Sequence, residues 1–265
     1  MSGPSSVLAL LCVLSSHPAS TPGPPGGVSS DPEMGERAVV ALPGGTMLDL
    51  IWVPGTTFPM GDAQGGDDER PMHDVPLDGF WIGATEVTVG QWRAVMGECS
   101  SRNDEGDTHP VMDVSWEDCQ AFCARTGLAL PTEAQWEYAA RGPLGHAFPW
   151  GNTWEAALCQ SWRDRHGHER TAPVGSLPDG RSWCGVLDMA GNVFEWCLDA
   201  YDAGFYASPA ARAPNAECAG GPDSQRVLRG GCWGSFPDNC RATVRCRAKP
   251  TFRNAGIGFR VCRRG

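Results

Sequence analysis

Glycine and proline restrict what this chain can fold into more than any other sequence feature. The 265 residues include 34 glycines and 22 prolines, spread along the whole sequence. Both residue types interrupt helices and strands and favour turns. The chain also has 11 tryptophans, whose large side chains supply buried area where regular elements are short. We therefore expect short elements joined by long irregular segments.

Three short helices are predicted from local capping signals. In each case a hydroxyl residue is followed three positions later by a polar acceptor, which is the capping-box arrangement or a close variant of it. Apolar residues then recur at helical spacing, and a glycine follows where the helix should stop. The predicted helices begin after Thr88, Ser115 and Thr132 and end at Gly97, Gly127 and Gly142.

Short strands are predicted from runs of apolar residues elsewhere in the chain. These runs are residues 48–53, 80–82, 226–229 and 258–262. Because a few short helices accompany scattered strands, the sequence predicts the α+β class with a large irregular fraction.

The first 36 residues differ in composition from the rest of the chain. Residues 7–14 (VLALLCVL) have the length of a signal-peptide hydrophobic region, and a Pro/Gly/Ser-rich linker follows. No lysine or arginine precedes the apolar run, and Cys12 leaves a lipid anchor open as an alternative. We expect residues 1–36 to be leader and linker, residues 37–265 to be the folded domain, and the product to be secreted or periplasmic. No other stretch reads as a membrane span.

Charge and cysteine content limit the partners and the compartment. The formal net charge of −10 argues against a nucleic-acid partner, because phosphate binding requires a basic surface. Lys249 is the only lysine, so Schiff-base chemistry has almost no candidate residue. Twelve cysteines favour an oxidising compartment and structural disulfides.

Eight short motifs occur in a fixed order along the chain. They are 58–61 (FPMG), 86–88 (EVT), 114–116 (VSW), 130–142 (LPTEAQWEYAARG), 148–151 (FPWG), 188–196 (DMAGNVFEW), 227–231 (VLRGG) and 256–260 (GIGFR). Together they resemble the formylglycine-generating enzyme (sulfatase-modifying factor) domain over about residues 45–265. The resemblance implies a variant of the C-type-lectin fold. It leaves several functions open, because some family members oxidise a sulfatase cysteine to formylglycine with copper and oxygen and others have no established chemistry.

The segment that should carry the oxidase chemistry is altered in this chain. In the oxidases of the family, two cysteines five positions apart follow the Gly-Gly pair and bind Cu(I), a soft ion that prefers thiolate ligands. Counting forward from Gly231 places these positions at Ser235 and Cys240, whereas counting backward from Arg260 places the first at Cys232. Neither register gives a cysteine pair at the required spacing. Cys232 and Cys240 are therefore candidate catalytic residues only under the oxidase interpretation.

The same cysteines have a structural interpretation. Cys232, Cys240 and Cys246 are disulfide partners or buried thiols if the domain is not an oxidase. The resemblance also implies a bridge between Cys123 and Cys262. However, Cys262 lies one residue later than in the family, which would turn its side chain to the other face of a strand.

The motif at 188–196 indicates a calcium site. Hard cations prefer carboxylate and carbonyl oxygens, and two carboxylates flank a Gly-Asn turn here. The resemblance implies structural Ca²⁺ held by the side chains of Asp188 and Glu195 and by the carbonyl groups of Gly191 and Val193. The alternative is that Asp188 caps the turn and Glu195 pairs with an arginine.

Two weaker candidate sites were considered. One is a transition-metal site made by His166, His168, Asp164 and Glu169, for which a solvated polar loop is the simpler interpretation. The other is a peptide or sugar groove made by Trp150, Trp183 and Trp233, for which core packing is the alternative.

Two function classes follow from the sequence. The first is an exported, calcium-stabilised, disulfide-containing binding or scaffold module that presents loops to a protein or peptide client. The second is a copper-dependent oxidase that converts a sulfatase cysteine to formylglycine. The oxidase needs two sulfurs that converge at a surface groove within residues 231–246, and the module does not.

Overall fold

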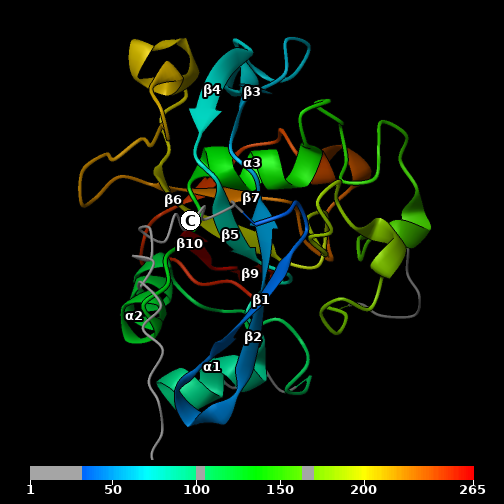
Figure 1. Cartoon of the computed structure of the whole chain (residues 1–265), viewed down its shortest axis with the longest axis vertical. Helices are drawn as coiled ribbons and strands as arrows, with labels where there is room; N and C mark the ends of the chain where they lie inside the picture. The colour runs from blue at the N-terminus through cyan, green and yellow to red at the C-terminus, as the bar shows by residue number, and fades with distance from the viewer. Residues whose placement is uncertain (1–31, 100–104, 163–169) are drawn as a thin grey trace, which may run out of the picture. The chain divides into compact units, whose positions relative to one another are not determined.

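The computed structural model describes residues 32–99, 105–162 and 170–265, and long loops connect its short regular elements (Figure 1). The strands are β1 (Arg37–Ala41), β2 (Met47–Val53), β3 (Thr56–Met60), β4 (His73–Leu77), β5 (Phe80–Gly83), β6 (Phe194–Ala200), β7 (Arg226–Arg229), β8 (Cys246–Ala248), β9 (Ile257–Gly258) and β10 (Cys262–Arg264). The α-helices are α1 (Val89–Met96), α2 (Trp116–Thr126) and α3 (Glu133–Arg141). Short 3-10 turns include η1 (Pro43–Gly45) and η8 (Pro237–Cys240).

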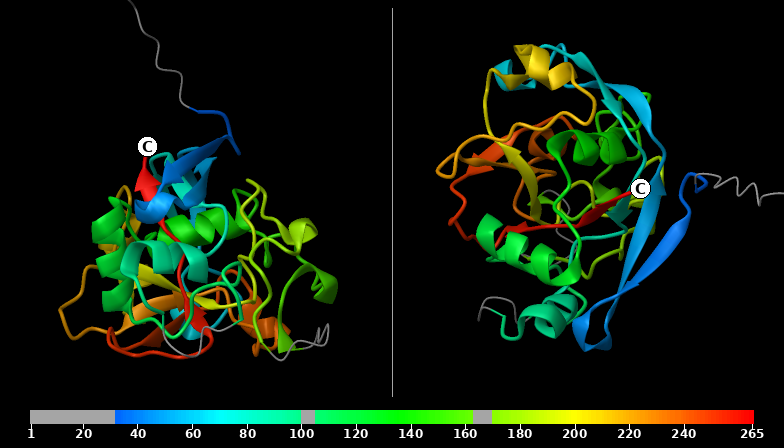
Figure 2. Two further views of the ribbon diagram at one scale, coloured as in Figure 1. Left: turned by 90° about the horizontal axis from the view of Figure 1, so that it is seen from below. Right: turned by 60° about the vertical axis from the view of Figure 1, so that its left-hand side comes forward.

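The strands form two four-stranded sheets and one hairpin. The first sheet has the order β1-β2-β5-β10, with antiparallel neighbours, and the second has the order β8-β7-β6-β9, in which β6 and β9 run parallel. β3 and β4 pair only with each other. The β1–β2 hairpin reaches to α1, which packs against the η1 turn at the hairpin tip (Figure 2). This mixture of sheets with few helices confirms the predicted α+β class.

All three predicted helices form where their capping signals lie. The hydroxyl oxygens of Thr88, Ser115 and Thr132 each accept a hydrogen bond from the backbone N–H three residues on, at 3.1, 3.2 and 3.2 Å. The polar side chain at that third position accepts in return from the cap backbone, at 2.7 to 2.9 Å. These reciprocal bonds satisfy N–H groups that a helix cannot pair internally.

The strand predictions are right in three cases and wrong in one. Residues 48–53, 80–82 and 226–229 lie in β2, β5 and β7. Residues 258–262 do not form one strand, because β9 ends at Gly258 and β10 begins at Cys262. All five of these residues are buried, so their apolar run reflects passage through the core rather than one extended strand.

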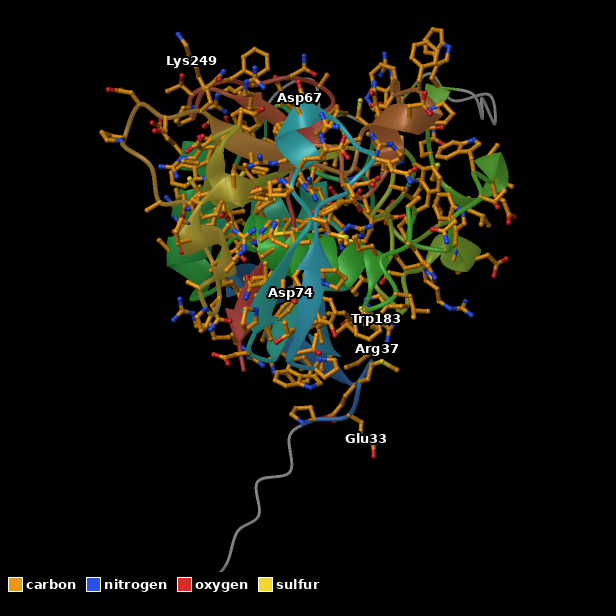
Figure 3. The ribbon with its side chains drawn as sticks, turned by 90° about the horizontal axis from the view of Figure 1, so that it is seen from above. Glu33, Arg37, Asp67, Asp74, Trp183 and Lys249 are labelled. Atoms are coloured by element: carbon orange, nitrogen blue, oxygen red, sulfur yellow. The ribbon has the colours of Figure 1, made fainter. Side chains whose placement is uncertain are left out.

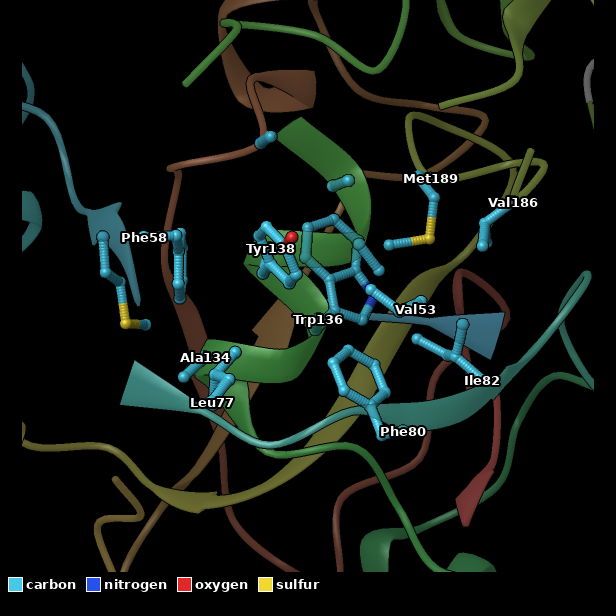
Figure 4. Packing of buried hydrophobic residues seen from close by; sticks show 14 of the residues in the cluster. Val53, Phe58, Leu77, Phe80, Ile82, Ala134, Trp136, Tyr138, Val186 and Met189 are labelled. Atoms are coloured by element: carbon cyan, nitrogen blue, oxygen red, sulfur yellow. The ribbon is translucent and has the colours of Figure 1, made fainter. Parts of the chain in front are cut away.

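The core is built around α3. Its side chains Trp136 and Tyr138 face the sheet residues Phe58 and Phe80 (Figure 4). The rings of Phe58 and Tyr138 lie 5.0 Å apart, and Trp136 and Phe58 have no exposed surface. A second cluster fills the space between α1, α2 and the first sheet. No helix in the described residues is long and apolar enough to cross a bilayer.

Candidate functional site

The loop that follows Gly231 folds back on itself at Cys232 and Ser235. The Ser235 hydroxyl accepts a hydrogen bond from the Cys232 backbone N–H at 2.9 Å and lies 3.6 Å from the Cys232 sulfur. The Ser235 carbonyl accepts from the backbone N–H of Trp162 at 3.1 Å. The Cys232 thiol is partly exposed. Within this turn it lies beside a hydroxyl group and not beside a second thiol.

Cys240 has a different environment from Cys232. It ends the η8 turn with no exposed surface, in a small apolar cluster with Cys159 and Ala190. Gly231 packs directly on it, because a Cβ atom at Gly231 would lie 2.8 Å from the Cys240 sulfur. The positive φ of 78° at Gly231 also favours glycine there. The Cys240 sulfur thus faces the interior.

An arginine fixes the far end of this loop. The Arg241 guanidinium donates two hydrogen bonds to the carboxylate of Glu69, both at 2.9 Å. Burial raises the pKa of Glu69, but the hydrogen bonds from Arg241 and its other partners outweigh burial and hold it at about 2. The ion pair therefore persists at any ordinary pH and ties the segment after Cys240 to the loop before β4.

Large aromatic side chains are exposed around this loop. Trp162 is 44% exposed and Phe236 is 56% exposed, and their rings lie 6.1 Å apart. Phe252 is 47% exposed, and nearby Trp233 donates its indole N–H to the carbonyl of Ala255 at 3.1 Å. Exposed aromatic groups of this size are uncommon on a surface without partners.

The three tryptophans considered for a groove lie in separate environments. Trp150 stacks on Phe148 at 5.5 Å, whereas Trp183 packs against Tyr138 at 5.0 Å. Trp183 and Lys249 are far apart in Figure 3, and Trp233 is held at the 252–256 loop that follows Lys249. Each of the three tryptophans thus has contacts of the kind that the packing interpretation expects.

The predicted calcium motif adopts a strained, tightly bonded turn. Asp188 has a positive φ of 59°, and its carboxylate accepts from the backbone N–H of Gly175 at 2.6 Å. Glu195 has no exposed surface, and its carboxylate accepts from Arg260 at 2.6 and 2.7 Å and from the indole of Trp136 at 2.7 Å. These are the contacts of the alternative interpretation, in which Asp188 caps the turn and Glu195 pairs with an arginine.

The structure adds a carboxylate that the sequence analysis did not consider. Glu86 is 1% exposed; its Oε1 atom accepts from the side-chain amide of Asn192 at 3.0 Å, and its Oε2 atom has no hydrogen-bond partner. Burial, and then the charges of Asp188 and Glu195, raise the pKa of Glu86 well above its ordinary value. The signal for it in the sequence is the Glu-Val-Thr motif at 86–88, which ends at the cap of the first predicted helix.

The calcium-motif cluster has more negative than positive charge. We use this name for the carboxylates of Glu86, Asp188 and Glu195 together with the guanidinium of Arg260. Fully ionised, it carries two uncompensated negative charges in a buried setting, and it contains one buried oxygen without a partner. Such a donor set suits a hard divalent cation. As they stand, no three His, Cys, Asp or Glu side chains in the described residues converge closely enough to hold a metal.

Comparison with known proteins identifies the family. A model described as the sulfatase-modifying factor enzyme 1-like domain matches residues 36–265. The chain belongs to this family. The formylglycine-generating enzyme of Streptomyces coelicolor is 32% identical over 280 residues, covering 79% of this chain and 87% of that protein. The structure of PvdO from Pseudomonas aeruginosa matches with a TM-score of 0.76 and 25% identity, covering 88% of this chain and 100% of that one.

Some relatives are much longer than this chain. The serine/threonine-protein kinase Pkn1 of Chlamydia trachomatis is 32% identical over 243 residues, covering 82% of this chain and 38% of the kinase. The chain thus spans less than half the length of that relative.

The predicted family bridge between Cys123 and Cys262 has both its residues in place. Both residues are buried. Burial, and then the charge of the nearby Cys123, raise the pKa of Cys262 to about 12. The one-residue offset does not turn Cys262 away, because residues 259–261 are not a regular strand. Eight described cysteines are unbridged thiols: Cys119, Cys123, Cys184, Cys197, Cys218, Cys232, Cys246 and Cys262.

Two of the predictions lie outside the described residues. The histidine-containing segment with Asp164, His166, His168 and Glu169 falls within 163–169. Of the predicted leader and linker at 1–36, residues 1–31, with Cys12, lie outside the described residues.

Proposed function

We propose that this sulfatase-modifying-factor domain is a calcium-stabilised binding module rather than a copper-dependent oxidase. The observation that carries the proposal is the difference between its two candidate sulfurs. Cys240 is fully buried, whereas Cys232 is partly exposed and lies beside the Ser235 hydroxyl. A Cu(I) site needs soft ligands that converge on one ion, and a serine hydroxyl is a poor ligand for it.

Calcium is proposed as the structural cofactor of the 188–195 turn. Asp188 and Glu86 would supply carboxylate oxygens, and Gly191 and Val193 would supply backbone carbonyls. Glu195 would complete the set while Arg260 orients its carboxylate. The support is the excess negative charge of the cluster and the unpartnered oxygen of Glu86. Bound calcium would link the 188–195 turn to the segment before α1, without chemistry of its own.

The proposed client is a protein or peptide that contacts the loop face. The exposed side chains of Trp162 and Phe236 lie at the turn that begins at Cys232, and Phe252 is exposed on the loop whose Ala255 carbonyl binds Trp233. Aromatic residues supply much of the binding energy at interfaces because they bury a large area with few rotatable bonds.

Export and disulfide formation belong to the same proposal. The number of cysteines and the apolar run at 7–14 support a secreted or periplasmic location, with a lipid anchor at Cys12 as the alternative. In an oxidising compartment the buried neighbours Cys123 and Cys262 would form the family bridge.

A copper-dependent oxidase is the second candidate function. Its support is the similarity to a bacterial formylglycine-generating enzyme and the presence of Cys240 in the forward register. It requires Cys240 to become accessible and a second sulfur to approach it.

A copper titration separates the two functions. Reduced protein is titrated with Cu(I) and then incubated with a Cys-x-Pro-x-Arg peptide under oxygen. We expect no tight copper uptake and no loss of the peptide thiol. The variant Ser235→Cys restores two cysteines five positions apart and should bind Cu(I) more tightly than the wild type. Tight uptake by the wild type that Cys240→Ala abolishes would show the oxidase interpretation to be right.

The client surface needs its own measurement. Peptides selected from a displayed library against the native protein should bind more weakly to the double variant Phe236→Ser, Phe252→Ser. Leu144→Ser is the matched control, because Leu144 is 79% exposed and belongs to the loop after α3. Equal loss in the control would mean that this aromatic surface is not the binding face.

A further inference from the structure

A cavity lies at the start of α3, away from the loop and the calcium motif described above. It has a volume of about 260 Å³. Its lining includes the buried Leu130 and Cys262 and the half-buried Leu198, and Thr132, Glu217 and Arg264 lie at its polar rim. None of its lining residues belongs to 188–195 or 231–246. We call this cavity the β10 pocket.

The walls of the β10 pocket are tied together by one buried carboxylate. Asp199 follows Leu198 in β6 and is 2% exposed. One of its oxygens accepts from the backbone N–H of Glu133, in the first turn of α3, at 2.7 Å. The other accepts from the backbone N–H of Cys218, in the loop that carries Glu217, at 2.8 Å. The helix wall and the loop wall are therefore fixed relative to each other.

A second tie holds the same loop to the β4–β5 turn. The Asn215 side chain exchanges two hydrogen bonds with Asp78, through the Asp78 backbone N–H at 2.9 Å and its carboxylate at 2.8 Å. Both residues line the pocket. A cavity whose walls are already bonded to each other loses little conformational freedom when a ligand enters.

The rim carries opposite charges that have no protein partner. Neither the Glu217 carboxylate nor the Arg264 guanidinium makes a hydrogen bond or ion pair with the described residues. Both side chains belong to exposed residues. Beneath them, the half-buried Leu198 supplies apolar surface, and Leu130 and Cys262 are almost wholly covered.

We propose that the β10 pocket binds a small zwitterion with an aliphatic body, which is the chemistry of a free aliphatic amino acid. The Arg264 guanidinium receives the ligand carboxylate, and Glu217 receives the ammonium group. The half-buried Leu198 contacts the aliphatic side chain. The volume of about 260 Å³ lies just below the range of sites for drug-sized molecules and suits a ligand of this size. A ligand with both charges can pair with Arg264 and Glu217 at the same time, whereas an amine or a carboxylic acid alone can pair with only one of them.

The test is a calorimetric titration of the whole chain with L-leucine and two single-charge analogues, isopentylamine and 4-methylpentanoate. Leucine is expected to bind saturably, and each analogue to bind about fivefold more weakly, the upper end for one exposed charge pair. Glu217→Gln and Arg264→Gln should each weaken leucine binding by about the same factor. Because both side chains are exposed, thermal unfolding of these variants is expected to match the wild type.

Arg263→Gln provides the matched control on the same strand. Successive residues of a strand face opposite sides, and the Arg263 guanidinium lies 5.7 Å from the centre of the Trp81 ring instead of lining the pocket. This variant should bind leucine as the wild type does. The proposal is wrong if leucine binding does not saturate, if an analogue binds as tightly as leucine, or if Arg263→Gln weakens binding as much as Arg264→Gln.

Discussion

Two buried charge clusters in this domain differ in how their charges balance. The balanced network joins α3 to the second sheet and the segment before β8. It contains three carboxylates and three guanidinium groups. Ion pairs join Glu133, Glu137, Arg141, Arg229 and Arg245, whereas Asp199 bonds only backbone N–H groups and is coupled to the network through the charge of Glu133. The calcium-motif cluster contains three carboxylates and only Arg260. The two lie on either side of Trp136, whose indole N–H bonds Glu195 and whose ring Arg229 covers.

Hydrogen bonding follows the charge balance. In the balanced network, Arg245 donates to both oxygens of Glu133 at 2.7 and 2.9 Å. Burial raises the pKa of Glu133, yet the charges of Arg245 and Arg229 lower it below its ordinary value overall. In the calcium-motif cluster the pKa of Glu86 rises instead, and one of its oxygens has no partner. A buried cluster that lacks positive charge is expected to take up a proton or a cation.

The largest expected effect is the loss of a cation from the balanced network. Arg229→Leu leaves Glu137 without a fully buried partner, and removing one member of a buried pair costs about 3–5 kcal/mol. We expect the free energy of unfolding, measured by urea denaturation, to fall by that amount. A loss below about 1 kcal/mol would mean that the network does not depend on charge balance.

The calcium-motif cluster should respond to the metal instead. Calcium at a hundredfold excess over its dissociation constant should raise the free energy of unfolding by about 3 kcal/mol, and a chelator should reverse the gain. Glu86→Gln removes a buried carboxylate whose pKa is raised by burial, so the metal-free protein should be at least as stable as the wild type. The same variant should lose most of the calcium response in calorimetric melting.

A calcium response that is unchanged in Glu86→Gln would remove Glu86 from the site. No response in the wild type would remove the calcium assignment altogether.

Asp199 offers a pH-dependent comparison within the balanced network. Burial, and then the charge of Glu133, raise its pKa to about 7. The folded state therefore holds a proton more tightly than the unfolded state. This stabilisation is fully present below the ordinary pKa near 4 and is lost as the pH rises through about 7. Between pH 5 and pH 8, the wild type should lose about 2 kcal/mol more of unfolding free energy than Asp199→Asn.

Parallel pH profiles of the wild type and Asp199→Asn would contradict this assignment. Urea denaturation at each pH gives the free energy of unfolding of both proteins. The titration of the other carboxylates cancels in the difference between them.

The smallest effect is expected for an exposed ion pair. Arg253 donates to Asp118 at 2.8 Å, but half of the Arg253 side chain is exposed to solvent. Arg253→Gln should lower the free energy of unfolding by about 0.5 kcal/mol or less, and salt should reduce the difference further. A larger loss of unfolding free energy would show that an exposed ion pair can matter as much as the buried ones, so that burial would not explain the difference.

The sequence predicted the elements whose causes are local. The capping boxes at Thr88, Ser115 and Thr132 were correct because every atom involved lies within three residues. The strands β1, β3 and β4 were missed because each has only five residues, and Pro59 and Pro76 interrupt two of them. Their pairing depends on neighbours elsewhere in the chain.

The sequence alone determined the family, the fold class and the helix boundaries of this protein, because ordered motifs and capping residues are read within short windows. Only the tertiary structure decided which partner each buried polar side chain has. Glu195 pairs with Arg260 across 65 residues, and Glu86 meets Asn192 across 106. Cys240 faces inward, and the walls of the β10 pocket come from five distant segments. A side chain's partner and burial depend on which segments pack around it, and residue spacing along the chain does not encode that arrangement.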